Sequence, residues 1–109
     1  MLNRILLVFL FSFGISSALF ISEVAEGSSN NKYIEIYNSS DQAVILNDVS
    51  LSSCSNGCDV DGQWDYPNNV TFEGASIAAG DVYVVCHGSA DAIIQAECCL
   101  LYTSDAADE

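Results

Sequence analysis

Cys54 and Cys58 are the first residues whose types and spacing could do chemistry, because only the turn sequence Ser-Asn-Gly separates the two thiols. A structural zinc site would need further thiolate or imidazole ligands at workable spacing, and the chain contains a single histidine, His87. A disulfide that closes the turn needs no further ligand. We therefore expect Cys54 and Cys58 to be joined to each other.

Cys86 and Cys98 are the second pair of candidate disulfide cysteines, and they would be joined across the segment 89–96. Four cysteines allow three connectivities, so the spacing alone leaves the pairing open. Cys86 also precedes His87, and a thiol beside an imidazole suggests a nucleophile with its base. Neighbours in a strand point to opposite faces of a sheet. Adjacent residues therefore rarely form a catalytic pair. A lone histidine next to Gly88 is more often a surface residue, so we expect His87 to be one, with no catalytic role.

Asp59, Asp61 and Asp65 place three carboxylates in one loop that also contains Gly62. Calcium is bound by oxygen ligands, so these residues are a weak candidate for a calcium site. The loop lacks the remaining positions of an EF-hand, including a glutamate at the twelfth position. A solvated acidic loop explains the aspartates better, and we expect no metal and no cofactor.

Trp64 and Tyr66 lie in the same loop and are the candidate binding residues. Aromatic side chains on an exposed loop are typical anchors for a partner. Surrounded by aspartates, they would suit a protein or carbohydrate partner better than an anionic one. The alternative is that both rings pack over the edge of the core.

Two further patterns concern modification and hydrolysis. Asn38 and Asn69 each begin an N-glycosylation sequon, which matters only in a eukaryotic source. Glu23 and Glu35 on adjacent strands could mimic the carboxylate pair of a glycosidase. Exposed acids on a strand explain them as well, and no nucleophile, base and oxyanion site can be assembled from the chain. We therefore expect no enzymatic activity.

The charge balance excludes several partners. Fifteen acidic residues against two basic ones give a formal net charge of −13. Such a surface repels the phosphates of nucleic acids and anionic lipid headgroups, so we expect no nucleic-acid binding. Acid-rich surfaces can attract cations or basic partners. The favoured interpretation of the charge is nevertheless a solvated surface on a soluble domain.

Residues 1–18 have the pattern of a signal peptide. Arg4 precedes the apolar run 5–15, and small residues at 16–18 offer a cleavage site before Leu19. A membrane anchor is the alternative, but a span needs about 20 apolar residues, and this run is shorter. We expect a secreted, extracellular protein without a transmembrane anchor after cleavage.

Alternating apolar and polar residues predict a β-hairpin at the start of the mature chain. Two such runs, 19–25 and 32–38, flank the polar turn 26–31. In the second run Ile34 and Ile36 would face one side of the sheet. The residues that would face the other side are Tyr33, Glu35 and Tyr37.

The rest of the chain predicts further short strands separated by turns. The expected strands are 43–46, 49–54, 70–72 and 81–86, and the expected turns are 39–41, 47–48, 56–57, 67–69 and 79–81. One helical turn is expected in the segment 89–96, with Ser89 as its N-cap and Ile93 packing inward. Many short strands without a long helix indicate a sandwich or barrel.

Four segments resemble the lamin tail domain in their amino-acid sequence, order and spacing. They are 21–24, 33–38, 44–51 and 77–85. The resemblance covers roughly residues 20–85. It implies an all-β, immunoglobulin-like β-sandwich, used as an accessory domain in extracellular proteins. The insertion 54–69 differs from nuclear lamins and looks like secreted members. The final strands of the family pattern are missing.

Residues 99–109 look like the translation of a sequencing adapter and not like protein-coding sequence; a natural acidic tail is the alternative. Without Cys99 the number of cysteines becomes even, as disulfide pairing in an oxidising compartment would produce. The expected organisation is a signal peptide at 1–18, a partial lamin-tail-like domain at 19–98 and a non-native tail at 99–109.

The expected function is that of a secreted, non-catalytic interaction or localisation module of lamin-tail type. The alternative is an amino-terminal accessory piece of a larger secreted enzyme, such as a nuclease or phosphatase, whose catalytic part is missing. The gene beyond Cys98 would discriminate between these two interpretations.

Overall fold

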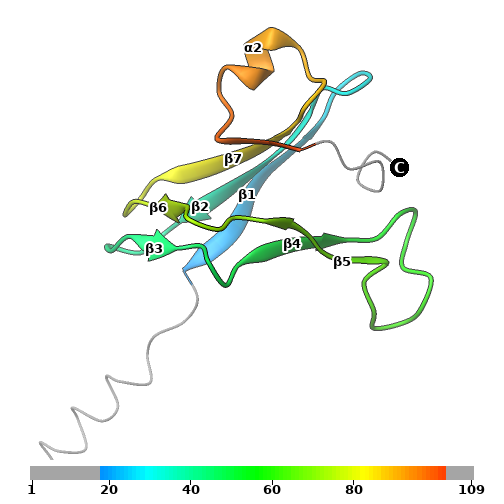
Figure 1. Cartoon of the computed structure of the whole chain (residues 1–109), viewed down its shortest axis with the longest axis horizontal. Helices are drawn as coiled ribbons and strands as arrows, with labels where there is room; N and C mark the ends of the chain where they lie inside the picture. The colour runs from blue at the N-terminus through cyan, green and yellow to red at the C-terminus, as the bar shows by residue number, and fades with distance from the viewer. Residues whose placement is uncertain (1–17, 103–109) are drawn as a thin grey trace, which may run out of the picture.

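The computed structural model describes residues 18–102 and shows an almost entirely β-stranded domain (Figure 1). The strands are β1 (Leu19–Glu26), β2 (Lys32–Asn38), β3 (Val44–Ile45), β4 (Ser50–Ser53), β5 (Tyr66–Thr71), β6 (Ser76–Ile77), β7 (Val82–His87) and β8 (Leu100–Tyr102). The described helix is α2 (Ala92–Gln95). The expected signal peptide, except Ala18, lies outside the described residues. Within residues 18–102 no helix is long and apolar enough to cross a membrane.

A four-stranded sheet in the order β1-β2-β7-β8 forms one layer of the domain. The expected hairpin is confirmed, because β1 and β2 pair antiparallel with Ile21 opposite Ile36 and Val24 opposite Ile34. The register shifts between Ile21 and Glu23, which is a β-bulge. Strand β7 pairs antiparallel with β2, and the short β8 pairs parallel with β7.

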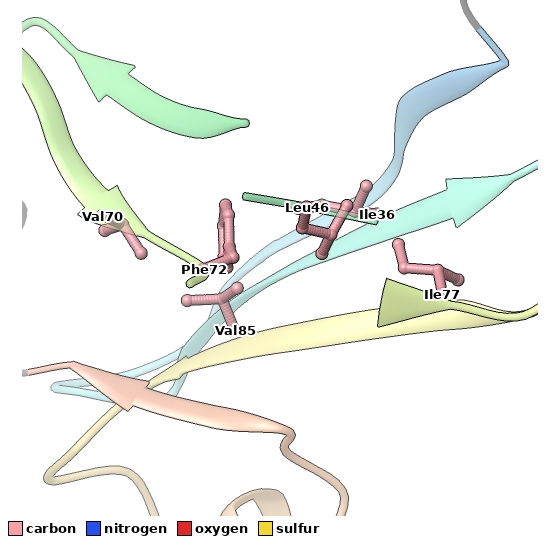
Figure 2. Close-up of a cluster of buried hydrophobic side chains, with 6 residues drawn as sticks. All are labelled: Ile36, Leu46, Val70, Phe72, Ile77 and Val85. Carbon is pink, nitrogen blue, oxygen red and sulfur yellow. The ribbon is translucent and has the colours of Figure 1, made fainter. Parts of the chain in front are cut away.

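Two two-stranded sheets, β3-β6 and β4-β5, form the second layer. Figure 1 shows both lying across one face of the four-stranded sheet. Figure 2 shows the buried side chains between the layers, which are Ile36, Leu46, Val70, Phe72, Ile77 and Val85. Each such side chain contributes about 1.5–3 kcal/mol when it leaves water. The expected β-sandwich, with Ile34 and Ile36 on its inner face, is confirmed.

Asn38 is a fully buried polar residue at the end of β2, with 0% of its surface exposed. Its Nδ2 donates to the carbonyl oxygens of Gln42 at 2.8 Å, Ile77 at 3.1 Å and Ala78 at 3.2 Å. Its Oδ1 accepts from the backbone nitrogen of Ser40 at 3.0 Å and from the Ser40 hydroxyl at 2.7 Å. The Asn38 side chain therefore links the end of β2, in the four-stranded sheet, to the end of β6, in the second layer.

The predicted turn at 67–69 is wrong, because these residues belong to β5. Asn68 nevertheless has the left-handed φ of 53° that turn residues adopt. Its backbone nitrogen donates to Ser52 Oγ at 2.9 Å, and the register of β4 and β5 shifts between Leu51 and Ser53. The turn-forming residue is thus used for an irregularity inside a strand pair.

The helical turn lies in the expected segment, but its N-cap and the packing of Ile93 differ from the prediction. The N-cap position is Asp91 and not Ser89, and the helix begins at Ala92. Ile93 does not pack inward, because 85% of its surface is exposed. The helix buries none of its residues and is held by other contacts.

Leu100–Tyr102 form β8 although they lie in the segment expected to be foreign. Leu100 and Tyr102 are partly buried against the core. Strand pairing of three residues does not reveal the origin of a sequence. The assignment of 99–109 as non-native therefore stays a prediction.

Candidate functional site

The loop 54–65 between β4 and β5 contains Trp64, one of the two candidate binding residues, and the other, Tyr66, begins β5 directly after the loop. Figure 1 shows it projecting from one end of the second layer. Cys54 and Cys58 are paired as a disulfide with their Cα atoms 4.9 Å apart. Between them Asn56 and Gly57 have φ angles of 53° and 90°, the left-handed backbone that asparagine and glycine tolerate best.

The carboxylate of Asp65, at the C-terminal end of the same loop, hydrogen-bonds to the backbone of the N-terminal half of the loop. Its Oδ2 accepts from the backbone nitrogen of Ser55 at 3.1 Å, and its Oδ1 accepts from the backbone nitrogen of Asp59 at 2.9 Å. Such hydrogen bonds to a charged acceptor are stronger than neutral ones. The disulfide and the carboxylate together restrain the backbone of the loop.

Trp64 extends from this restrained loop with 60% of its surface exposed. A shallow depression of about 260 Å³ lies beside the indole, lined by Cys58, Gly62 and Gln63. Tyr66, the other predicted anchor, is half-buried at the start of β5, where it pairs with Ser53. The structure therefore leaves Trp64 as the exposed aromatic residue of the predicted pair.

The three aspartates of the loop are not brought together as a metal site. Within residues 18–102 no group of three or more histidine, cysteine, aspartate or glutamate side chains is placed to hold a metal ion. Both oxygens of Asp65 already accept backbone amide hydrogens. The weak calcium candidate formed by Asp59, Asp61 and Asp65 therefore has no geometric support.

Cys86 and Cys98 form the second pair, with Cα atoms 5.9 Å apart, and the described free cysteine is Cys99. His87 is not the expected surface residue, since only 4% of it is exposed. It pairs with Tyr102 of the neighbouring β8, its ring packs edge-on against the Tyr102 ring with the centroids 5.8 Å apart, and its Nδ1 accepts from the backbone nitrogen of Ser89 at 2.9 Å.

The two candidate glycosylation residues differ in accessibility. The Nδ2 of Asn38, to which a glycan would be attached, is buried and donates to three carbonyl oxygens. This arrangement has no room for a glycan, so Asn38 is a structural residue in the folded domain. Asn69 is half-buried in β5, and its glycosylation stays a prediction.

Glu23 and Glu35 lie opposite each other across β1 and β2, as expected. Glu23 Oε1 accepts from the Tyr33 hydroxyl, and Glu35 Oε1 accepts from Ser22 Oγ at 2.8 Å. The hydrogen bond to the Glu23 carboxylate, aided by partial desolvation and the charges of both glutamates, raises the pKa of Tyr33 above its usual value of 10. Each carboxylate is thus engaged by a neighbouring hydroxyl.

The sequence did not predict a groove beside these glutamates. A hollow of about 380 Å³ lies between the outer face of β2 and β7 and the segment that contains α2. The residues that line it are Tyr33, Glu35, Val82, Val84, Cys86, Ile93, Ile94, Glu97 and Cys99. The alternation of β2 and β7 indicates which residues share the outer face. It does not indicate that the helical segment folds over that face.

Two packed β-layers with a buried apolar centre define an immunoglobulin-like β-sandwich. The family model of the Lamin Tail Domain matches residues 15–108. The chain therefore belongs to the lamin tail domain family, as the resemblance of its sequence indicated. No curated protein and no solved structure matches the chain.

Proposed function

We propose that this lamin tail domain is a secreted, non-catalytic interaction module that localises its host by binding a protein or a carbohydrate. The binding surface is the loop 54–65, with Trp64 at its centre. Membership of an immunoglobulin-like domain family supports an interaction role. Two cysteine pairs at disulfide geometry are compatible with an extracellular location.

The observation that carries the proposal is the exposure of a large indole on a restrained loop. With 60% of its surface in contact with water, Trp64 offers an apolar area that a partner can bury. The Cys54–Cys58 disulfide and the Asp65 carboxylate already fix the backbone around it. Binding through a pre-ordered anchor loses little conformational entropy, which favours such residues as binding hot spots.

The experiment compares Trp64→Ala with Val60→Ala. Val60 is a matched control because it is an exposed apolar residue of the same loop. The purified chain and both variants are applied to an array of glycans and an array of extracellular proteins. We expect the parent chain and Val60→Ala to share at least one ligand, and Trp64→Ala to bind it about tenfold more weakly or worse. Absence of any ligand, or equal binding by Trp64→Ala, would contradict the proposal.

A further inference from the structure

A disulfide and several hydrogen bonds hold one wall of the groove on the outer face of the four-stranded sheet. Residues 88–99, called the lip below, form one wall of it and include α2. The Cys86–Cys98 disulfide joins the lip to β7. The backbone nitrogen of Cys99 also donates to the carbonyl oxygen of Val84 at 2.9 Å. Figure 1 shows the lip standing beside the end of β7.

Hydrogen bonds hold the other end of the lip. Asn31, in the turn between β1 and β2, donates from Nδ2 to Asp91 Oδ2 at 2.9 Å and accepts from the Asp91 backbone nitrogen at 2.8 Å. Within the lip, Gln95 Nε2 donates to the carbonyl oxygens of Ala90 at 2.6 Å and Gly88 at 3.2 Å. Covalent and polar contacts therefore fix the lip at both ends.

Because these contacts hold the lip, its isoleucines are not used to anchor it. Helix α2 buries none of its residues, and Ile93 is 85% exposed at the groove. Ile94 is half-buried, and Val82 and Val84 of β7 supply a half-buried apolar floor. A hollow of about 380 Å³ lies at the lower end of the range of ligand pockets, which is about 300–1,000 Å³.

The charged side chains that line the groove, Glu35 and Glu97, are both acidic. Glu23, which is hydrogen-bonded to the groove residue Tyr33, adds a third carboxylate. The chain has only two strong bases, and the one among the described residues, Lys32, does not line the groove. A ligand with apolar side chains and positive charge complements this surface in both respects.

We propose that the groove binds a short basic and apolar peptide segment of a partner protein. Its lysine or arginine side chains would lie against Glu35 and Glu97, and its apolar side chains would contact Val84 and Ile93. A second copy of this chain is a poor occupant, because fifteen acidic residues oppose two basic ones. The site is separate from the Trp64 loop and goes beyond the proposed function.

The test measures binding of a dye-labelled heptapeptide of alternating leucine and lysine to the full chain by fluorescence anisotropy. The groove variants are Ile93→Ser and Glu97→Lys, which alter exposed side chains. Ile45→Ser and Glu73→Lys are matched controls, because both residues are exposed and lie outside the groove. None of the four substituted residues belongs to 99–109, although Cys99 of that segment also lines the groove.

We expect each groove variant to weaken peptide binding about tenfold and each control to change it by less than about twofold. A peptide of alternating serine and lysine should bind far more weakly, since it lacks the apolar contacts. No binding at about 1 mM protein would overturn the proposal. Equal binding of the serine peptide would also overturn it by showing charge attraction alone.

Trp64→Ala separates this site from the loop. It should leave the peptide affinity unchanged, whereas a large loss would place the peptide on the loop and overturn the groove proposal. Failure of the peptide test would leave the array test of Trp64 unaffected, because the two tests use different ligands and different residues.

Discussion

Asn31 and Asp91 hydrogen-bond to each other twice although 60 residues of sequence separate them. Asn31 Nδ2 donates to the Asp91 carboxylate, and the Asp91 backbone nitrogen donates to Asn31 Oδ1. The pair fastens the first turn of the domain to the start of α2, and so fixes one end of the groove.

Replacing Asn31 with alanine should therefore loosen α2 more than it lowers global stability. We expect a loss of about 0.5–1.5 kcal/mol in the free energy of unfolding, since the contact is exposed. Amide hydrogen exchange at residues 92–96 should accelerate clearly. Asn30→Ala in the same turn is the control and should change neither quantity. Unchanged exchange in α2 would show that the disulfide alone holds the lip.

Asn38 should be among the residues least tolerant of substitution. Asn38→Ala leaves the buried carbonyl oxygen of Ile77 and the partly buried carbonyl oxygen of Ala78 without this donor, at a cost of about 1–3 kcal/mol. Asn69→Ala, at a half-buried asparagine of β5, should cost less than about 1 kcal/mol. Urea unfolding measures both. Similar small losses for the two variants would contradict the role assigned to Asn38.

Asn38→Asp should add a pH dependence whose sign follows from the same contacts. A carboxylate facing three carbonyl oxygens favours its protonated form, so its pKa should lie above the usual value for aspartate. When folding raises the pKa of a carboxyl, the free energy of unfolding of the protein falls as the pH rises. The variant should therefore be closer to the parent chain at pH 4 than at pH 7, when each is measured against the parent at the same pH.

Features that depend on local contacts could be predicted from the sequence, whereas features that depend on contacts between distant segments could not. The hairpin was predictable because the period-two alternation of β2 places Ile34 and Ile36 on one face. The burial of His87 was not, because its ring packs against Tyr102 of β8, and that strand lies in a segment expected to be foreign. The exposure of Ile93 likewise depends on how the distant contacts hold the lip.

The loop shows the same division. An exposed tryptophan was expected, and Trp64 is exposed, because its neighbours are polar and the segment has no apolar alternation. Tyr66 is half-buried since it begins a strand that the sequence placed four residues later. Asn68 shows that a residue with the right backbone preference can serve a bulge as well as a turn.

The two disulfides should contribute unequally to stability. Restricting the unfolded chain contributes more for a longer loop, and the sequence separations are 4 for Cys54–Cys58 and 12 for Cys86–Cys98. The chain-entropy relation gives about 2 and about 3 kcal/mol respectively. Paired cysteine-to-serine variants compared by chemical unfolding measure this. Peptide mapping without reduction should recover both links, and free thiols at Cys54 and Cys58 would refute the first.

Tyr33 should titrate above the ordinary tyrosine pKa of 10, chiefly because its hydroxyl donates to the Glu23 carboxylate. Since folding raises this pKa, the stabilisation is present below the unfolded value and is lost as the pH rises through the folded value. Glu23→Gln should return the pKa of Tyr33 toward 10. Glu26→Gln, on the same strand, should leave it unchanged. NMR titration of ring-labelled tyrosine measures the pKa of Tyr33 in the parent chain and in both variants. A Tyr33 pKa near 10 in the parent chain would contradict the hydrogen bond to Glu23.

The most direct test of the central claim uses the fact that Trp64 is the only tryptophan in the chain. Its emission therefore reports the environment of the loop without a contribution from any other tryptophan of the chain. When the glycan or protein identified on the arrays is added, burial of the indole should move the emission to shorter wavelength and protect it from quenching by acrylamide. Binding that leaves both the wavelength and the quenching of Trp64 unchanged would show that the partner is held elsewhere, and the loop would not be the binding site.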